Sequence, residues 1–231
     1  MTAPLPAAVL WDMDGTLVDT EPQWRDAQQA LLARRGLPQL TPEEESSLIG
    51  CDLQEAARMF IERFGVAAEP DAIIAEVGAH VLELTRARLD WRPGARELLD
   101  ALDAAGVPCA LVTNSLRPLA EAVVEAHGGA PFAEIVAAED VERAKPAPDP
   151  YLLACERLGV DPARCVVLED SPYGVAAGIA AGCAVLGVPH GVPLDGAGVE
   201  LRGSLAGVAP ADLADLLDRA SRARAAREGA Q

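Results

Sequence analysis

Basic side chains are scarce in this chain. Of its 231 residues, 19 are Lys or Arg and 36 are Asp or Glu, which gives a formal net charge of −17 at pH 7. A protein face that binds the phosphates of a nucleic acid is expected to be net basic, so we expect no nucleic-acid partner. The deficit still leaves room for a local anion site made of one lysine and backbone amides, because such a site needs few cations.

Long apolar runs and paired cysteines are absent as well. No apolar stretch reaches the roughly 18 residues that a membrane-spanning helix needs. Residues 1–6 lack the basic stretch followed by a long apolar one that marks a signal peptide. The five cysteines form no C-x-x-C pair and their number is odd, which is typical of reduced thiols. The sequence therefore predicts a cytoplasmic protein without a membrane segment.

Apolar residues, by contrast, make up 50% of the chain. At this length they suit one large α/β domain, or one domain that carries a smaller insertion. They gather in short, uniformly apolar runs at residues 7–11, 107–112, 135–138, 165–168 and 183–188. Such runs are typical of strands covered on both faces, which usually means a parallel sheet.

Helical segments alternate with the later apolar runs. Ser171 followed by Pro172 has the pattern of an N-cap and a first helical position. Ser115 is expected to cap another helix, which Gly128 closes. This alternation of strands and helices predicts a doubly wound α/β core.

A long segment after the first strand departs from this alternation, because residues 19–90 contain several helical patterns and no clear strand. Two capping boxes begin helices there, Thr41 with Glu44 and Asp52 with Glu55. An ordinary crossover needs only one helix. We therefore expect a helical bundle over residues 19–90, inserted into an α/β core formed by residues 1–18 and 91–231.

Two carboxylates stand directly after the first predicted strand, in the sequence Asp12-Met13-Asp14-Gly15-Thr16. Ligand sites in open parallel sheets lie outside the carboxyl ends of the strands. On an extended chain Asp12 and Asp14 point differently, so one can face a metal or an electrophile while the other reaches a leaving group. The alternative is a simple Asp-Gly surface turn, but the position at the strand end favours a site.

Four motifs at predicted strand ends resemble, in chain order, those of the haloacid dehalogenase superfamily of phosphotransferases. Asp12-x-Asp14-Gly15-Thr16 is similar to the family's nucleophile motif. The other three are Val112-Thr113-Asn114, Lys145-Pro146-x-Pro148-Asp149 and Glu169-Asp170-Ser171. The resemblance covers essentially the whole chain. It implies a doubly wound, Rossmann-like parallel-sheet core with an inserted helical-bundle cap.

The same resemblance implies Mg²⁺-dependent phosphoryl transfer. Asp12 would attack phosphorus and become an aspartyl phosphate, while Asp14 protonates the leaving oxygen and then activates water. A divalent cation neutralises the repulsion between carboxylate and phosphate, and hard oxygen ligands suit Mg²⁺. By resemblance, the ligands are the side chains of Asp12 and Asp170, the backbone carbonyl of Asp14 and, in an assisting role, Glu169.

Phosphate-binding residues follow from the resemblance too. The Thr113 hydroxyl and the amide after it, at Asn114, would hold the phosphoryl group, although threonine is also an ordinary strand residue. Lys145 is the only lysine in the chain. A compact ammonium fits a tight phosphoryl site better than a planar guanidinium does. The alternative for Lys145 is a solvated surface lysine.

Substrate contacts are expected from the cap. If the cap matches the family, Glu21 and the loop Gly50-Cys51-Asp52 face the cleft, and Glu21 contacts the substrate. The alternative is helix-start chemistry, with Glu21 placed before Pro22 and Asp52 acting as an N-cap.

The sequence thus predicts a phosphatase for a small phosphorylated metabolite, with a sugar phosphate favoured. The β-phosphoglucomutases are the nearest rival, because Asp19 and Thr20 match their extended motif. A histidine and a cap arginine of that family are replaced here by Trp24 and Leu53, which weakens the mutase interpretation. A non-catalytic phosphate-binding module is the alternative from another class, and the intact motifs argue against it.

Overall fold

A computed structural model describes residues 3–128, 131–195 and 199–228 of the chain. Six parallel strands form its central sheet, in the order β5-β4-β1-β6-β7-β8. Their bounds are β1 Ala8–Trp11, β4 Cys109–Val112, β5 Glu134–Val136, β6 Cys165–Glu169, β7 Ala184–Gly187 and β8 Glu200–Leu201. Each predicted apolar run contributes one strand. Within this sheet, the edge strand β8 was missed because its two residues form no apolar run.

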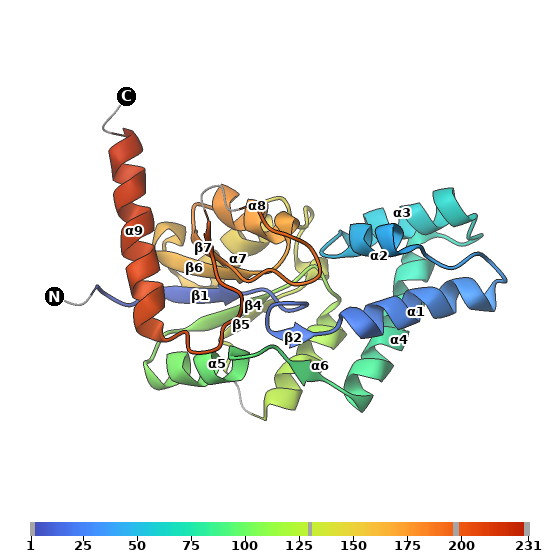
Figure 1. Cartoon of the computed structure of the whole chain (residues 1–231), viewed down its shortest axis with the longest axis horizontal. Coiled ribbons are helices and arrows are strands. Elements are labelled where there is room, and N and C mark those ends of the chain that lie inside the picture. Colours follow the sequence, from blue (N-terminus) through green and yellow to red (C-terminus); the bar gives the residue numbers. More distant parts are fainter. Residues whose placement is uncertain (1–2, 129–130, 196–198, 229–231) are drawn as a thin grey trace.

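Helices cover both faces of this sheet (Figure 1). One face packs against α7 (Asp149–Leu158) and α8 (Pro172–Ala180), and the other against α5 (Ala95–Ala104), α6 (Arg117–His127) and α9 (Pro210–Glu228). Successive side chains of a strand point to opposite faces, so Val9 and Trp11 join one core cluster while Ala8 and Leu10 join the other. This confirms the doubly wound α/β fold.

Four helices are inserted between β1 and the rest of the core. They are α1 Glu21–Arg34, α2 Pro42–Leu48, α3 Leu53–Phe64 and α4 Pro70–Ala87, called here the helical insertion. Figure 1 shows them together at the end of the molecule opposite α9. The chain enters and leaves through β2 (Val18–Asp19) and β3 (Asp90–Trp91), which pair antiparallel. Within the insertion α4 packs against α1 and α3, and it also touches α6 of the core.

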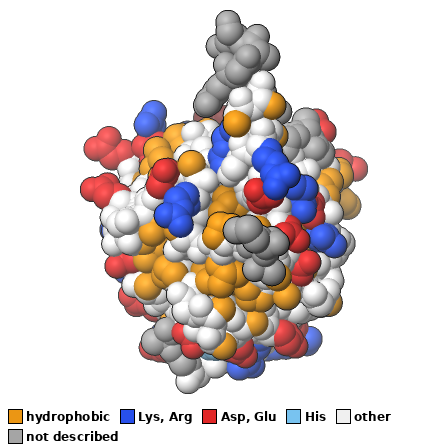
Figure 2. All heavy atoms as spheres, turned by 90° about the vertical axis from the view of Figure 1, so that its left-hand side faces the viewer, with side chains coloured by type: hydrophobic (Ala, Val, Ile, Leu, Met, Phe, Trp, Pro, Cys, Tyr) orange, Lys and Arg blue, Asp and Glu red, His pale blue; other side chains and the backbone are white. Residues whose placement is uncertain are grey.

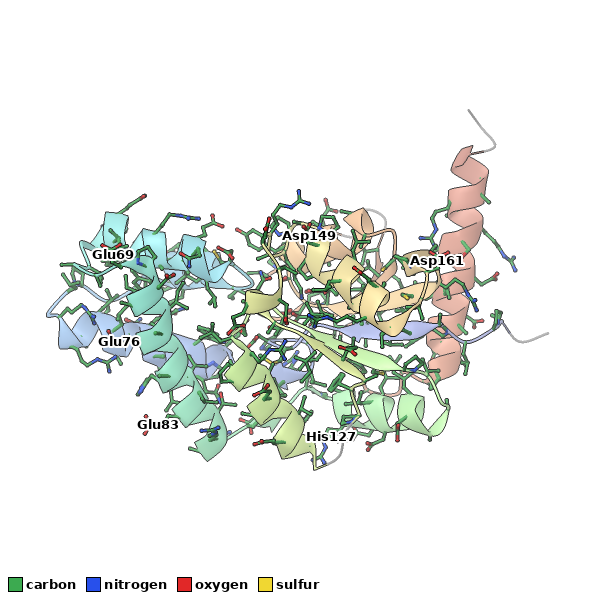
Figure 3. The ribbon with its side chains drawn as sticks, turned by 180° about the vertical axis from the view of Figure 1, so that it is seen from behind. Glu69, Glu76, Glu83, His127, Asp149 and Asp161 are labelled. Atoms are coloured by element: carbon green, nitrogen blue, oxygen red, sulfur yellow. The ribbon has the colours of Figure 1, made fainter. Side chains whose placement is uncertain are left out.

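The direction of the strands decides which end of the sheet faces the helical insertion. Figure 3 shows Asp149, the first residue of α7, near the insertion, and Asp161, which follows that helix, far from it. Because α7 returns the chain from one parallel strand to the next, it runs against the strands. The carboxyl ends of the strands therefore face the insertion, and Figure 2 shows the opposite end of the core, where apolar side chains are mixed with both charges.

The structure confirms some of the predicted helix caps and contradicts others. The Thr41–Glu44 capping box is present. Asp52 caps α3 by accepting from the amides of Gln54 and Glu55, without a reciprocal bond from Glu55. The prediction that Ser115 caps α6 is wrong, since that helix begins after Leu116, and the N–H of its first residue, Arg117, donates to the Glu139 carboxylate instead. Two 3₁₀ turns, Ala138–Asp140 and Pro162–Arg164, complete the described elements.

Among the described residues, no helix combines the length and apolarity that crossing a membrane requires.

Replacing Leu10 tests the packing of the sheet. Its side chain is fully buried in β1, so Leu10→Ala leaves a cavity that its neighbours fill only in part. We expect the free energy of unfolding to fall by about 2–5 kcal/mol. Leu152→Ala, at a side chain 41% exposed, is the matched control and should cost less than about 1 kcal/mol. Urea unfolding followed by circular dichroism measures both, and equal losses would contradict the core assignment.

Candidate active site

A pocket of about 290 Å³ opens at the carboxyl ends of the central strands. The core contributes residues that follow β1, β4 and β6, and the helical insertion contributes residues of all four of its helices and of the loop before α3. The pocket therefore lies between the two sets of elements. It brings together Asp12, Asp14, Glu21, Thr113, Asn114, Lys145 and Asp170, seven of the eight predicted site residues.

Lys145 lies beneath this pocket and is 2% exposed, so it is not a solvated surface lysine. Its ammonium donates three hydrogen bonds, to Asp12 Oδ1 at 2.7 Å, Glu169 Oε1 at 2.7 Å and the Val112 carbonyl at 2.8 Å. Burial alone would lower the pKa of Lys145, but the Asp12 and Glu169 carboxylates beside it raise that pKa above its usual value. The two carboxylates thus favour the charged form of this buried side chain.

Glu169 is the eighth predicted residue and lies wholly inside the protein. Its Oε1 accepts from Lys145 and from the Tyr151 hydroxyl, at 2.7 and 2.8 Å. Its Oε2 accepts from the backbone amides of Asp170 and Ser171, at 3.1 and 3.2 Å. A Cβ at position 174 would lie 1.6 Å from Oε1, so only glycine fits there. Both oxygens are thus already used in holding Lys145 and the start of α8.

Asp12 and Asp170 differ from Glu169 because each has one oxygen without a partner. Asp12 Oδ2 and Asp170 Oδ2 are buried and accept no hydrogen bond from the described part of the chain. With Glu169 they form a group whose ligand atoms lie within 4.8 Å of one another. Burial, and next the Glu169 charge, raise the pKa of Asp12 to about 7 against the opposing effect of Lys145.

The same crowding acts on Asp170, whose pKa is raised by burial and by Asp12 and Glu169. Gly15 makes the close approach of the chain possible, since it has φ of +88° and a Cβ there would lie 2.1 Å from Asp170 Oδ2. Three buried carboxylates with one ammonium leave excess negative charge and two free oxygens. A hard divalent cation fits this donor set.

Asp14 is held apart from that cluster by hydrogen bonds of its own. Its Oδ1 accepts from the Thr20 hydroxyl and from Trp24 Nε1, the latter at 3.0 Å. Its Oδ2 accepts from the hydroxyls of Thr113 and Ser115, at 3.2 and 2.7 Å. The Ser115 hydroxyl thus serves this carboxylate instead of capping α6. Two donors come from the entry to the insertion and two from the segment after β4.

Comparison with known proteins assigns the family. Residues 6–182 match the family model of haloacid dehalogenase-like hydrolases. This chain belongs to the haloacid dehalogenase-like hydrolases. The match spans the first strand, the helical insertion and most of the core.

Among curated relatives of this hydrolase is hexitol phosphatase A of Escherichia coli (strain K12). It is 40% identical over 184 residues, which cover 78% of this chain and 81% of that protein. The bifunctional riboflavin kinase/FMN phosphatase of Arabidopsis thaliana is 37% identical over 190 residues, or 80% of this chain, but the chain spans only 49% of that protein's length. These relatives are named for phosphatase activity.

Among solved structures, CbbY from Rhodobacter sphaeroides in complex with phosphate is similar to this hydrolase. Its TM-score is 0.84 at 30% identity, with 90% of this chain and 99% of that chain covered. A mutant of the same CbbY has been crystallised with xylulose-(1,5)bisphosphate. The likeness extends over nearly all of both chains, so it includes the helical insertion.

Glu21, the first residue of α1, lines the pocket of this hydrolase. Burial raises the pKa of Glu21, with His190 and Asp19 acting in opposite directions. Its Oε1 is buried and has no partner among the described residues. From the predicted loop, Gly50 and Cys51 line the pocket, whereas Asp52 lies outside the lining and caps α3.

Sequence reasoning did not connect several residues of the site with the carboxylates that they hydrogen-bond. Tyr151 bonds Glu169 from within α7, where it looks like any buried aromatic residue. The hydroxyls of Thr20 and Ser115 reach Asp14. Ser115 could have been found, because it directly follows Thr113 and Asn114 at a strand end. Tyr151 could not, because only the fold places α7 beside the end of β6.

The stability of the metal-free hydrolase should depend on pH through Asp12. Its pKa of about 7 in the folded state exceeds the roughly 4 of the unfolded chain, so the folded state binds the proton more tightly. This stabilising effect is complete below about pH 4 and is lost as the pH rises through the folded value. Because a divalent cation binds ionised carboxylates, Mg²⁺ should raise the melting temperature more at about pH 8 than at about pH 5.

Differential scanning fluorimetry with and without Mg²⁺ measures this shift. Asp170→Asn removes one carboxylate of the cluster and should lose most of the Mg²⁺-dependent increase. A shift of equal size at both pH values in the unmodified protein would contradict the prediction.

Proposed function

We propose that this hydrolase is a phosphatase that uses Mg²⁺ to hydrolyse the phosphate monoester of a small metabolite, with a sugar phosphate favoured. The observation that carries the proposal is the state of Asp12. One of its oxygens is bonded to Lys145, the other is buried and has no partner in the described part of the chain, and the side chain forms one group with Glu169 and Asp170. That arrangement suits a nucleophile whose attack on an anionic phosphate needs a cation beside it.

Mg²⁺ would be held by the side chains of Asp12 and Asp170 and the backbone carbonyl of Asp14. When bound, it would neutralise the repulsion between carboxylate and phosphate and orient both. Glu169 remains a candidate ligand, but its oxygens already accept hydrogen bonds from Lys145, Tyr151 and the backbone. Its role in this proposal is to keep Lys145 charged and in place.

In the first step an Asp12 oxygen forms a bond to phosphorus while the bond from phosphorus to the ester oxygen breaks. Asp14 gives its proton to the leaving oxygen. In the second step Asp14 takes a proton from water, the water oxygen bonds to phosphorus, and the bond to Asp12 breaks. Lys145 supports both steps as a fixed positive charge, and the Thr113 hydroxyl and the Asn114 amide hold the phosphoryl oxygens.

The donors around Asp14 limit when it can act. All four are hydroxyl or indole groups that now point at its oxygens. To carry a proton to a leaving group, Asp14 must give up at least one of these bonds. The Trp24 indole N–H only donates, so it cannot itself relay a proton.

A sugar phosphate is favoured by the walls of the pocket and by the relatives. The insertion lines the pocket with Glu21, Arg25 and Gln28 from α1 and with apolar side chains from α3 and α4. Glu21 Oε1, which no described residue bonds, suits a sugar hydroxyl. The similarity to hexitol phosphatase A supports the same class of substrate.

We propose the domain division on the same basis, with residues 1–18 and 91–231 as the catalytic core and residues 19–90 as a cap over the pocket. The paired strands β2 and β3 link the two parts. A cytoplasmic location, with no nucleic-acid or membrane partner, stays a prediction from composition.

Two alternatives fit the chain less well. In a β-phosphoglucomutase, the residues replaced here by Trp24 and Leu53 are a histidine and an arginine, and both replacements line this pocket. Leu53 offers no cation for a second phosphate. A non-catalytic phosphate-binding module would have no need for the paired Asp12 and Asp14.

Asp12→Asn should fold normally and lose phosphatase activity, because an amide is a poor nucleophile and a poor Mg²⁺ ligand. We expect the release of phosphate from an aryl phosphate to fall by at least about a thousandfold, or roughly 4 kcal/mol of barrier. Asp26→Asn, at an exposed position of α1, is the matched control and should keep full activity. Residual turnover of Asp12→Asn within about tenfold of wild type would contradict the nucleophile assignment.

Chelation with EDTA should abolish the activity of the wild type, and Mg²⁺ should restore it. Full activity after exhaustive chelation would contradict the metal assignment.

Incubation with glucose 1-phosphate separates phosphatase from mutase. Without a proton relay at Trp24 or a cation at Leu53, the phosphoryl group on Asp12 should be transferred to water, and not back to a sugar, at every turnover. Free phosphate should therefore appear well ahead of glucose 6-phosphate, and glucose 1,6-bisphosphate should not stimulate the reaction. The reverse result, with the isomer accumulating first, would refute the assignment and make Arg25, Arg58 and His80 the residues to test.

A further inference from the structure

The side-chain amide of Asn114 hydrogen-bonds both the N–H and the carbonyl of Lys145. The chain contains one asparagine and one lysine, and they are these two residues. The Lys145 backbone N–H donates to Asn114 Oδ1 at 3.1 Å, and Asn114 Nδ2 donates to the Lys145 carbonyl at 3.3 Å. Two hydrogen bonds to the main chain of one residue fix where its side chain starts. Asn114 therefore holds the Lys145 backbone in the position from which the Lys145 ammonium reaches Asp12.

The same amide nitrogen reaches the helical insertion. Asn114 Nδ2 also donates to the carbonyl of Gly50, at 3.3 Å, in the loop between α2 and α3. An amide NH₂ group has two hydrogens, and here each has one carbonyl acceptor. One acceptor belongs to the core and the other to the insertion, so both hydrogens are used only when the loop lies against the core.

The loop at Gly50 is seated closely. Gly50 has φ of +71°, and a Cβ there would lie 2.8 Å from Ser171 Cβ. Ser171 is the N-cap of α8 and directly follows Asp170. A side chain at position 50 would be strained by the backbone conformation and would push the loop away from the core. The contact between Gly50 and Asn114 thus depends on the absence of a side chain at position 50.

We propose that Asn114 is a positioning residue that couples docking of the Gly50 loop to the placement of Lys145. When the insertion closes over a substrate, the loop carbonyl takes one amide hydrogen and fixes the Asn114 side chain, which in turn fixes the Lys145 backbone. When the loop leaves, the Asn114 amide loses one of its three hydrogen bonds, and Lys145 is held less firmly. The effect on catalysis rests on the proposed function, because it uses the role assigned there to Lys145.

The contact between Asn114 and the Gly50 loop, called here the latch, can be tested by hydrogen–deuterium exchange, which does not depend on catalysis. The Cys51 N–H is bonded to the Leu48 carbonyl at 3.2 Å within the loop. Loss of the contact with Asn114 removes support for this turn, so faster exchange of the Cys51 N–H reports that the loop is held less firmly. In Asn114→Ala, exchange in residues 48–53 should become at least about threefold faster than in wild type. Gln54→Ala is the matched control: it removes an amide that bonds Asp71 within the insertion, and it should leave exchange at Cys51 and activity unchanged.

A double-mutant cycle tests the coupling. Asn114→Ala and Gly50→Ala should each lower kcat by about tenfold or more. The double variant should be no more than about threefold below the slower single variant, because both changes break one contact. If the two losses multiply, Asn114 and Gly50 act independently and the coupling is refuted. Melting temperatures of all variants identify any that fail to fold. If Gly50→Ala fails to fold, the exchange experiment on Asn114→Ala decides the question alone.

The outcomes separate this inference from the proposed function. Unchanged exchange at Cys51 in Asn114→Ala overturns the latch even if the wild type is an active phosphatase. Faster exchange in a protein that hydrolyses no phosphate monoester supports the latch and overturns the proposed function instead.

Discussion

The site depends on one buried ammonium. Asp12, Glu169 and Asp170 are brought within 4.8 Å of one another at the strand ends, where three carboxylates repel. Lys145 offsets part of that repulsion by bonding two of them at 2.7 Å. Leaving such a buried charge without its partner typically costs about 3–5 kcal/mol. The arrangement of α7, β6 and the start of α8 around Glu169 serves to keep this ion pair dry and fixed.

One ammonium for three carboxylates also explains what remains unsatisfied. Among the described residues of this cluster, Asp12 and Asp170 each have one oxygen without a partner, whereas both Glu169 oxygens accept hydrogen bonds. The two carboxylates with an unpartnered oxygen therefore line the pocket, where the proposed cation and phosphate would bind. Asp14, two residues after Asp12, is kept out of this cluster by four donors. Neighbouring carboxylates thus have different surroundings, and different surroundings allow different roles.

Much of the fold was predictable because burial on both faces leaves a clear trace in the sequence. The five apolar runs became five parallel strands, and the strand-poor stretch became the helical insertion. Resemblance found the motif residues, and the structure places seven of them and Glu21 in or directly beneath one pocket. Ser115 was wrongly assigned as a cap because a local pattern cannot weigh a distant carboxylate against a helix end. Strand β8 was missed because two residues carry no pattern.

Periodicity and motifs are local properties of the chain, so the layers, the strand ends and the kinds of functional group that meet there can be predicted from the amino-acid sequence. Which atom bonds which depends on the folded arrangement. Lys145 and Asp12 are 133 residues apart, and Ser115 and Asp14 are 101 apart. Their contacts arise because parallel strands bring all their carboxyl ends to one edge, and the exact partner then depends on register, helix placement and the space left by Gly15 and Gly174.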